Sequence, residues 1–126
     1  MAVFGIGTDI LQLNRMRSEI LQESDPFVRS TFTEKERKEA ARRKDPRLYF
    51  AGRFAAKEAV YKALRLTPEL VDLSEIEILT TSSGAPRVIL HDRMLAYKNQ
   101  QGIRKIHISL SNEEEMVLAF ALAETE

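Results

Sequence analysis

The chain has 126 residues, equal numbers of basic and acidic side chains at 19 each, and no cysteine. This length fits one domain with its own core, and the balanced charge favours neither nucleic acid nor a membrane surface as a partner. Disulfide and thiol chemistry are excluded, and no apolar run suits a signal peptide or membrane span, so we expect one cytoplasmic domain over residues 1–126.

The first part of the chain predicts a strand followed by helices. Residues 3–8 (VFGIGT) indicate a strand, and apolar residues at helical spacing predict a helix over 10–21. Thr33 and Glu36 form a capping box, and the helix that it opens should run to about Lys44.

The longest predicted helix covers about residues 48–65 and has two unlike faces. One face is a stripe of small side chains that lets another element approach closely, formed by Ala56, Ala59, Val60 and Ala63. The other face includes Glu58 and Lys62, which lie one turn apart. Such a pair is commonly a surface ion pair, worth about 0.3–0.5 kcal/mol.

The second half of the chain is richer in strands. Residues 76–80 and 87–90 predict a hairpin, and Asp92 should cap a helix. Residues 105–110 alternate as a half-buried strand, whereas 116–123 are nearly all apolar and predict a central strand buried on both faces. The expected class is α+β, with a mostly antiparallel sheet and a long central helix.

Asp9 lies where the first strand is expected to end. Aspartate is a common helix cap, but it is also a hard oxygen ligand. One or two carboxylates together with substrate phosphates commonly hold Mg²⁺. Asp9 and Glu58 would supply that number if the first strand packs beside the long helix.

The chain carries G-T-D at residues 7–9 and F-x-x-K-E-A-x-x-K at residues 54–62. Together these motifs resemble those of the stand-alone 4′-phosphopantetheinyl transferases, the holo-[acyl-carrier-protein] synthase family, and the resemblance covers nearly the whole chain. It implies the 4′-phosphopantetheinyl transferase fold, assembled as a trimer. It also implies a function in fatty acid biosynthesis. The implied reaction transfers 4′-phosphopantetheine from coenzyme A to a serine of apo acyl carrier protein and releases 3′,5′-ADP.

The resemblance also implies roles for the central residues. Asp9 and Glu58 would bind Mg²⁺, which also binds the pyrophosphate of coenzyme A. Lys62 would touch the phosphate or assist proton transfer. Either Glu58 or a water on the metal would accept the serine proton. The expected catalytic residues are therefore Glu58 and Lys62.

Further residues are candidates for binding the two substrates. Arg42, Arg43 and Lys44 form either a solvated helix end or a clamp on the 3′-phosphate of coenzyme A. Arg53 lies in the best-matching stretch, residues 50–64 (FAGRFAAKEAVYKAL), and is the better candidate for binding phosphate. The remaining candidates are Gly84 and Pro86, which resemble a family turn along the pantetheine arm, and Arg15 and Arg17, expected to dock the acidic carrier.

The sequence departs from the family at Asn112, which stands where the family often has a histidine. Two other classes of function fit parts of the chain. A nucleic-acid-binding module could use the basic residues between Lys35 and Lys44, but glutamates interrupt them. A non-catalytic subunit would not need Asp9, Glu58 and Lys62 together.

Overall fold

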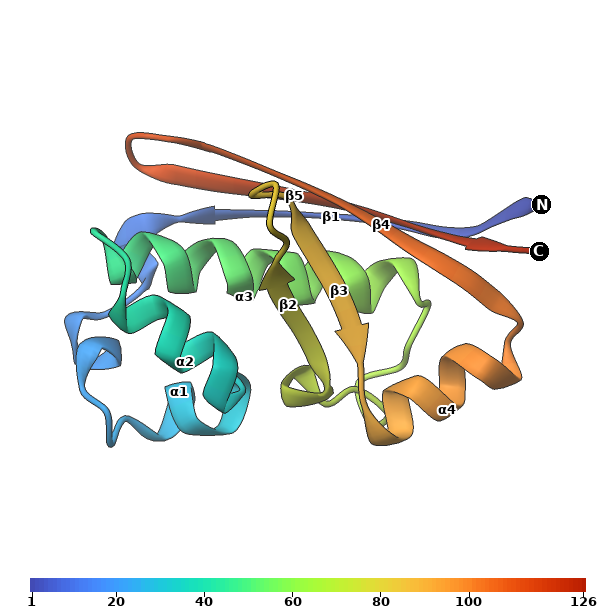
Figure 1. The fold of residues 1–126 in the computed structure, drawn as a ribbon, viewed down its shortest axis with the longest axis horizontal. Helices are drawn as coiled ribbons and strands as arrows, with labels where there is room; N and C mark the ends of the chain where they lie inside the picture. The colour runs from blue at the N-terminus through green and yellow to red at the C-terminus, as the bar shows by residue number, and fades with distance from the viewer.

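The computed structural model describes residues 1–126 and has the expected α+β architecture (Figure 1). Its main sheet has three antiparallel strands, in the order β1-β5-β4. The long helix α3, Pro46–Ala63, packs along one face of this sheet. The strands are β1 Ala2–Gln12, β4 Ile103–Glu113 and β5 Met116–Thr125.

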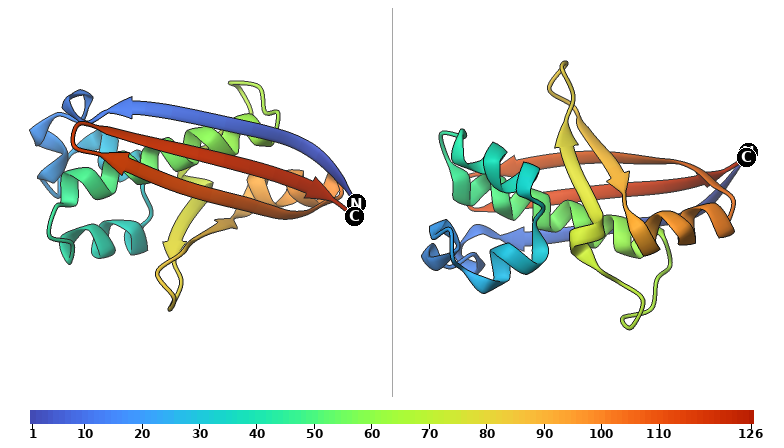
Figure 2. Two further views of the ribbon diagram at one scale, coloured as in Figure 1. Left: turned by 90° about the horizontal axis from the view of Figure 1, so that it is seen from above. Right: turned by 60° about the horizontal axis from the view of Figure 1, so that its bottom comes forward.

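The helices outside α3 lie on its side away from the main sheet, whereas a two-stranded hairpin passes beside α3 and contacts the edge strand β4 (Figures 1 and 2). Two short helices lie near the start of α3, a two-stranded hairpin crosses its middle, and a last helix lies near its end. These elements are α1 Pro26–Thr31, α2 Glu34–Ala41, β2 Ile76–Thr80, β3 Pro86–Leu90 and α4 Asp92–Gln100. No helix combines the length and apolar character needed to cross a membrane.

Local signals set several of these boundaries as the sequence predicted. Thr33 and Glu36 form the expected capping box at the start of α2. The side chain of Asp45 accepts a hydrogen bond from the Leu48 amide, and Pro46 fills the first position of α3. The long helix therefore begins slightly earlier than predicted, and the predicted hairpin is confirmed.

The helix predicted over residues 10–21 is wrong. β1 instead continues to Gln12, because its register with β5 persists through Ile10↔Leu118 and Gln12↔Met116. Two short 3-10 helices, Leu13–Arg15 and Ser18–Leu21, follow the strand.

Two aspartates differ from their predicted places in these elements. Asp9 lies within β1, opposite Ala119, and neither ends the strand nor caps a helix. Asp92 is the first residue of α4 and not its cap, which is His91.

β5 is the central strand, as predicted, but only one of its faces is buried within the chain. Val117, Ala119 and Ala121 are buried against α3, whereas Leu118 and Phe120 are 44% and 40% exposed. The prediction of burial on both faces is therefore wrong for the isolated chain. The outer faces of β1 and β5 form one apolar surface, which we call the outer patch. It consists of Ile6, Ile10, Met116, Leu118 and Phe120.

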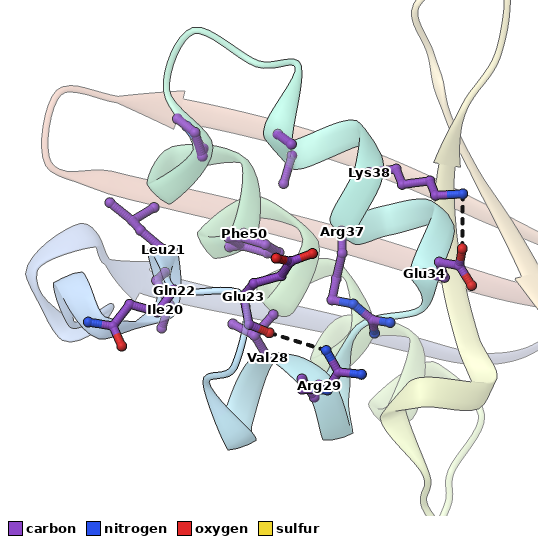
Figure 3. Close-up of a pocket in the computed structure, with 13 residues that line it drawn as sticks. Ile20, Leu21, Gln22, Glu23, Val28, Arg29, Glu34, Arg37, Lys38 and Phe50 are labelled. Atoms are coloured by element: carbon purple, nitrogen blue, oxygen red, sulfur yellow. Dashed lines mark hydrogen bonds and ion pairs between the residues drawn. The ribbon is translucent and has the colours of Figure 1, made fainter.

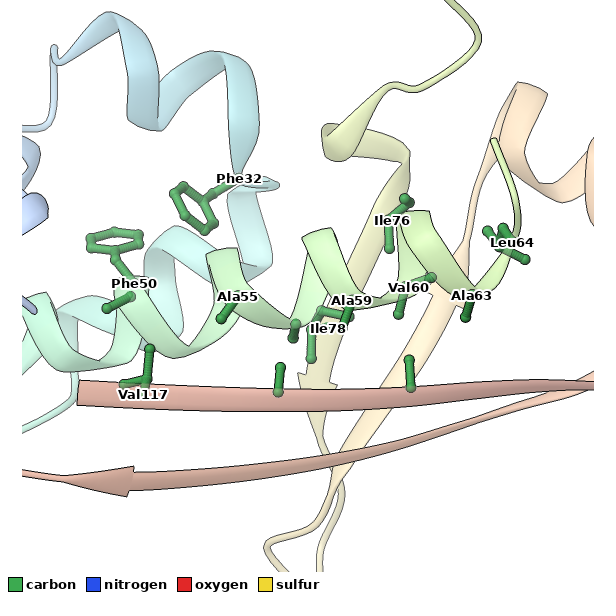
Figure 4. Packing of buried hydrophobic residues seen from close by; sticks show 14 of the residues in the cluster. Phe32, Phe50, Ala55, Ala59, Val60, Ala63, Leu64, Ile76, Ile78 and Val117 are labelled. Carbon is green, nitrogen blue, oxygen red and sulfur yellow. The ribbon is translucent and has the colours of Figure 1, made fainter. Parts of the chain in front are cut away.

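Glycines and alanines let the sheet and α3 approach very closely. A Cβ atom added at Gly7 would lie 2.0 Å from the Ala59 carbonyl oxygen, and one added at Gly5 would lie 2.2 Å from that of Ala63. Both alanines are fully buried in the core (Figure 4). β1 therefore runs antiparallel to α3, and its next inward residue after Gly7 is Asp9, which is brought toward Glu58.

Candidate active site

Asp9, Glu58 and Lys62 form one cluster where β1 crosses α3, as the sequence predicted. The Nζ atom of Lys62 lies 3.6 Å from Oδ1 of Asp9 and donates a hydrogen bond of 2.8 Å to the Thr8 carbonyl oxygen. Glu58 is close enough for the charge of Asp9 to shift its pKa. Glu58 makes no ion pair within the chain and is half-buried.

The positive charge of Lys62 does not fully compensate the two carboxylates of this cluster. Burial raises the pKa of Asp9, and the Lys62 ammonium only partly opposes this shift. Burial also raises the pKa of Glu58, and the negative charge of Asp9 raises it further. A bound divalent cation would remove the repulsion between the two groups.

The donor set fits Mg²⁺ better than a metal held by protein ligands alone. No group of three or more Asp, Glu, His or Cys side chains in the chain could hold a metal ion. Asp9 and Glu58 therefore offer two carboxylates and leave other positions to water and substrate. This is the usual arrangement for Mg²⁺ in phosphate-handling sites.

A second part of the predicted site is a basic pocket of about 350 Å³ at the start of α3. We call it the basic pocket. Its lining includes Arg43, Lys44, Tyr49, Arg53 and Asn112. The structure thus brings together three predicted phosphate ligands and the asparagine that replaces the family histidine. None of the pocket's lining residues is Asp9, Glu58 or Lys62.

The two arginines of the basic pocket share the same partners. The guanidinium carbons of Arg43 and Arg53 lie 4.9 Å and 4.6 Å from the centre of the Tyr49 ring. Each arginine also donates a hydrogen bond from Nη2 to the Thr80 hydroxyl oxygen at the end of β2. Arg43 additionally pairs with Glu39 at 2.9 Å, whereas Arg53 pairs with no carboxylate.

The other candidate residues lie apart from both clusters within the chain. Gly84 is exposed at the tip of the β2–β3 hairpin with φ of 90°, which glycine adopts readily. Pro86 lines a different pocket, of about 630 Å³, between β3, α4 and β4. Arg15 and Arg17 are exposed beyond the end of β1.

A wider pocket of about 730 Å³ opens between α2 and the segment after β1, and Figure 3 shows its lining. Val28 and Phe50 lie at its apolar side, and Arg29 and Arg37 lie at its polar side. It contains none of the predicted site residues.

Sequence reasoning missed the role of Lys57, the first of the two lysines of the matched motif. Lys57 is fully buried, pairs with Glu36 at 2.9 Å and donates hydrogen bonds to the carbonyl oxygens of Leu73 and Ile76. Its helical spacing from the buried Val60 and Leu64 was the available signal. Thr80 was also missed, because its hydrogen bonds with Arg43 and Arg53 join segments distant in sequence. Tyr49 was missed although Arg53 lies four residues later on the same helix, a spacing that brings two side chains together.

Comparisons with known proteins find relatives over nearly the whole chain. A family model described as the 4′-phosphopantetheinyl transferase superfamily matches residues 5–121. The holo-[acyl-carrier-protein] synthase of Clostridium kluyveri is 35% identical over 124 residues, which cover 98% of this chain and 92% of the relative.

Solved structures show the same likeness. The holo-[acyl-carrier-protein] synthase from Neisseria meningitidis superposes with a TM-score of 0.88 at 34% identity, covering 98% of this chain and 99% of that one. The Bacillus anthracis enzyme, solved in complex with CoA (3′,5′-ADP), gives a TM-score of 0.80 at 30% identity over 100% of both chains. With its fold, its two motifs and its full length matched, this chain belongs to the 4′-phosphopantetheinyl transferase superfamily, in the holo-[acyl-carrier-protein] synthase family.

Proposed function

We propose that this chain transfers 4′-phosphopantetheine from coenzyme A to a serine of apo acyl carrier protein, which supplies the holo carrier for fatty acid biosynthesis. The observation that carries the proposal is the cluster of Asp9, Glu58 and Lys62 in a chain matched by the family over residues 5–121. The serine oxygen forms a bond to the β-phosphorus of coenzyme A. The bond from that phosphorus to the bridging oxygen breaks, and 3′,5′-ADP leaves with the α-phosphate.

Asp9 and Glu58 would hold Mg²⁺ in this reaction. Their fit rests on two facing carboxylates whose pKa values are raised by burial and, for Glu58, by mutual repulsion. When bound, Mg²⁺ neutralises charge on the pyrophosphate and so favours displacement at phosphorus. Strand β1 and helix α3 each supply one ligand, so the close packing of these two elements fixes the ligand positions.

Lys62 and Glu58 have complementary roles toward the reacting groups. The Lys62 ammonium is half-exposed and already held near Asp9, so it can donate to a phosphate oxygen whose charge grows during transfer. Glu58 makes no hydrogen bond within the chain, and a carboxylate has several lone-pair positions. Glu58 is therefore the group that we assign to accept the serine proton.

Arg43, Lys44 and Arg53 would bind the 3′-phosphate of coenzyme A in the basic pocket. Guanidinium groups suit phosphate because they donate several hydrogen bonds in a fixed plane. Gly84 and Pro86 would line the pantetheine arm. The basic pocket and the pair Gly84 and Pro86 lie in different parts of the single chain. Coenzyme A is a long molecule, so it would have to contact both parts at once.

This separation supports a homotrimer in which neighbouring chains complete each active site. The outer patch supplies an apolar surface for such contacts, since Ile6 and Ile10 are 60% and 62% exposed in the single chain. Exposed apolar surfaces of this kind commonly mark interfaces. The partner copy would cover the second face of β5, which the isolated chain leaves open.

The carrier protein would approach the exposed residues Arg15 and Arg17. The sequence had suggested a helix that starts at Asp9 and carries both residues. In the structure, Arg15 instead ends the first 3-10 helix after β1, and Arg17 precedes the second. The side chains are exposed, and neither forms an ion pair within the chain. Both therefore remain available to an acidic partner.

The decisive experiment incubates the protein with coenzyme A, Mg²⁺ and apo acyl carrier protein, and weighs the carrier by mass spectrometry. We expect a gain equal to one phosphopantetheine group. Glu58→Gln should abolish the gain, and His91→Gln, a change away from the site, should not. An unmodified carrier with wild-type protein would reject the proposed function.

A further inference from the structure

Helix α3 contains two buried cations that are treated differently. Lys57 is fully buried and is neutralised by Glu36 at 2.9 Å. Arg53 is 8% exposed, yet no carboxylate lies within ion-pair distance, and its Nε atom has no hydrogen-bond partner. A buried charge without a counter-ion is costly. The missing partner of Arg53 is therefore expected to be an anion from outside the chain.

The ring of Tyr49 supports both arginines of the basic pocket. Arg43 and Arg53 lie over this ring at 4.9 Å and 4.6 Å, within the range of cation–π contacts. The Tyr49 hydroxyl is buried and unpartnered, as is Nε of Arg53, and both residues line the pocket. Two unfilled donor groups in one basic pocket fit a ligand rich in acceptor oxygens.

The Thr80 hydroxyl joins the two arginines directly. Its oxygen accepts a hydrogen bond from Nη2 of both Arg43 and Arg53. A hydroxyl oxygen has two acceptor positions, so both are filled by guanidinium groups. Like charges repel, so a shared acceptor and the shared ring of Tyr49 help to hold the two guanidinium groups together. Thr80 supplies such an acceptor from β2, outside the matched motif.

We propose that Thr80 and the ring of Tyr49 are positioning residues that hold Arg43 and Arg53 as one receptor for a terminal phosphate. This receptor makes the enzyme select coenzyme A over 3′-dephospho-coenzyme A. The inference rests on the proposed function and adds the residues that set the selectivity. A phosphate monoester carries close to two negative charges at neutral pH, whereas the dephospho compound offers only a hydroxyl at this position.

The test compares the binding of both compounds by calorimetry, together with KM and kcat for transfer. Wild-type protein should bind coenzyme A at least about tenfold more tightly than 3′-dephospho-coenzyme A, as expected for charge-assisted hydrogen bonds. Thr80→Val should lower this ratio at least about threefold by weakening only coenzyme A binding. Thr80→Ser should restore the ratio, and Tyr49→Leu should also lower it.

A matched control is Thr81→Val, because the Thr81 hydroxyl contacts Ser83 and neither arginine. This variant should keep the wild-type ratio. A general folding defect would weaken both compounds equally, so the ratio separates positioning from stability. If Thr80→Val keeps the wild-type preference for coenzyme A while wild-type protein is active in transfer, the positioning role is wrong. The proposed function would then still stand. Loss of discrimination in wild-type protein would overturn the phosphate assignment, and no transfer at all would overturn the proposed function and the inference with it.

Discussion

The ammonium group of Lys57 lies 2.9 Å from a carboxylate oxygen of Glu36, and neither side chain is exposed to solvent. The same carboxylate accepts hydrogen bonds of 2.8 Å from the amides of Thr33 and Ile78. Burial lowers the pKa of Lys57, and the charge of Glu36 opposes that shift. This one pair therefore ties α2 and β2 to the long helix that carries Glu58 and Lys62.

We predict that Lys57→Met destabilises the fold by about 3–5 kcal/mol, because Glu36 would remain as an unpaired buried charge. Urea unfolding measures the change. Lys62→Met, on the exposed side of the same helix, is the control and should change stability by less than about 1 kcal/mol. Equal losses of unfolding free energy for the two substitutions would show that the buried ion pair contributes no more to stability than an exposed lysine.

The close contact between β1 and α3 gives a second prediction. Gly7→Ala should destabilise the protein by about 1–3 kcal/mol, because the added Cβ would overlap the Ala59 carbonyl oxygen. Gly52→Ala is the matched control, since its Cβ would meet nothing within 4 Å in the middle of α3. That substitution should stabilise the fold by about 0.4–1 kcal/mol. Thermal or urea unfolding compares the two, and a harmless Gly7→Ala would contradict the packing.

A third prediction concerns metal binding without reference to turnover. Mg²⁺ should raise the melting temperature of wild-type protein at neutral pH, because it binds the folded state. Asp9→Asn should abolish this shift. Without Mg²⁺, Asp9→Asn should melt at a higher temperature than wild type, since it removes a repelled carboxylate.

The pH dependence of stability provides a separate check on the same cluster. The pKa of Asp9 is raised above its usual 3.8 and that of Glu58 above 4.5 in the folded state. Over the pH range in which the two carboxyl groups titrate, the folded protein therefore binds more protons than the unfolded chain. The free energy of unfolding consequently falls as pH rises through that range. Calorimetry of wild type against Asp9→Asn at acid and neutral pH should show their difference growing with pH. A constant difference would argue against the coupled cluster.

A fourth prediction tests the assembly. Phe120→Asp should convert the proposed trimer to monomers and reduce transfer, because a charge would then occupy the centre of the outer patch. Asn99→Asp on the exposed part of α4 adds the same charge away from the outer patch. Light scattering should show a trimer for that control. A monomeric wild-type protein would remove the proposal of shared sites.

A fifth prediction concerns the carrier. Arg15→Glu should raise KM for apo carrier protein at least about tenfold at low salt, with KM for coenzyme A nearly unchanged. Arg93→Glu makes the same charge change on exposed α4, outside the pockets assigned to coenzyme A, and should leave both values near wild type. Equal carrier KM values for wild type and Arg15→Glu would place the docking surface elsewhere.

Sequence reasoning worked best where the determinants were local. The capping box at Thr33 and the two faces of α3 depend on residues within a few turns, and both were predicted. The cluster of Asp9, Glu58 and Lys62 was predicted through the two matched motifs. Periodicity alone could not have paired a strand residue with a helix residue about fifty positions later in the chain.

Non-local contacts account for the errors. The helix predicted over residues 10–21 was wrong because pairing with β5, almost a full chain length away, extends β1 to Gln12. Thr80 gave no sequence signal for its contact with Arg53, since the hydrogen bond joins residues 27 positions apart. The outward apolar residues of β5 made it look buried on both faces, although no other part of the single chain covers them.

Asp9 belongs to the sheet and Glu58 to the helix, so the gap between their carboxylates depends on how closely these two layers lie. Gly5 and Gly7 determine that spacing, because a Cβ atom at either position would overlap a backbone carbonyl oxygen of α3. In the proposed metal site, the size of the cation that fits would thereby be set from behind the site. Mg²⁺ requires oxygen ligands at about 2.0–2.1 Å and Ca²⁺ at about 2.3–2.6 Å, so we expect a methyl group added at either glycine to move the preference of the proposed site toward the larger ion.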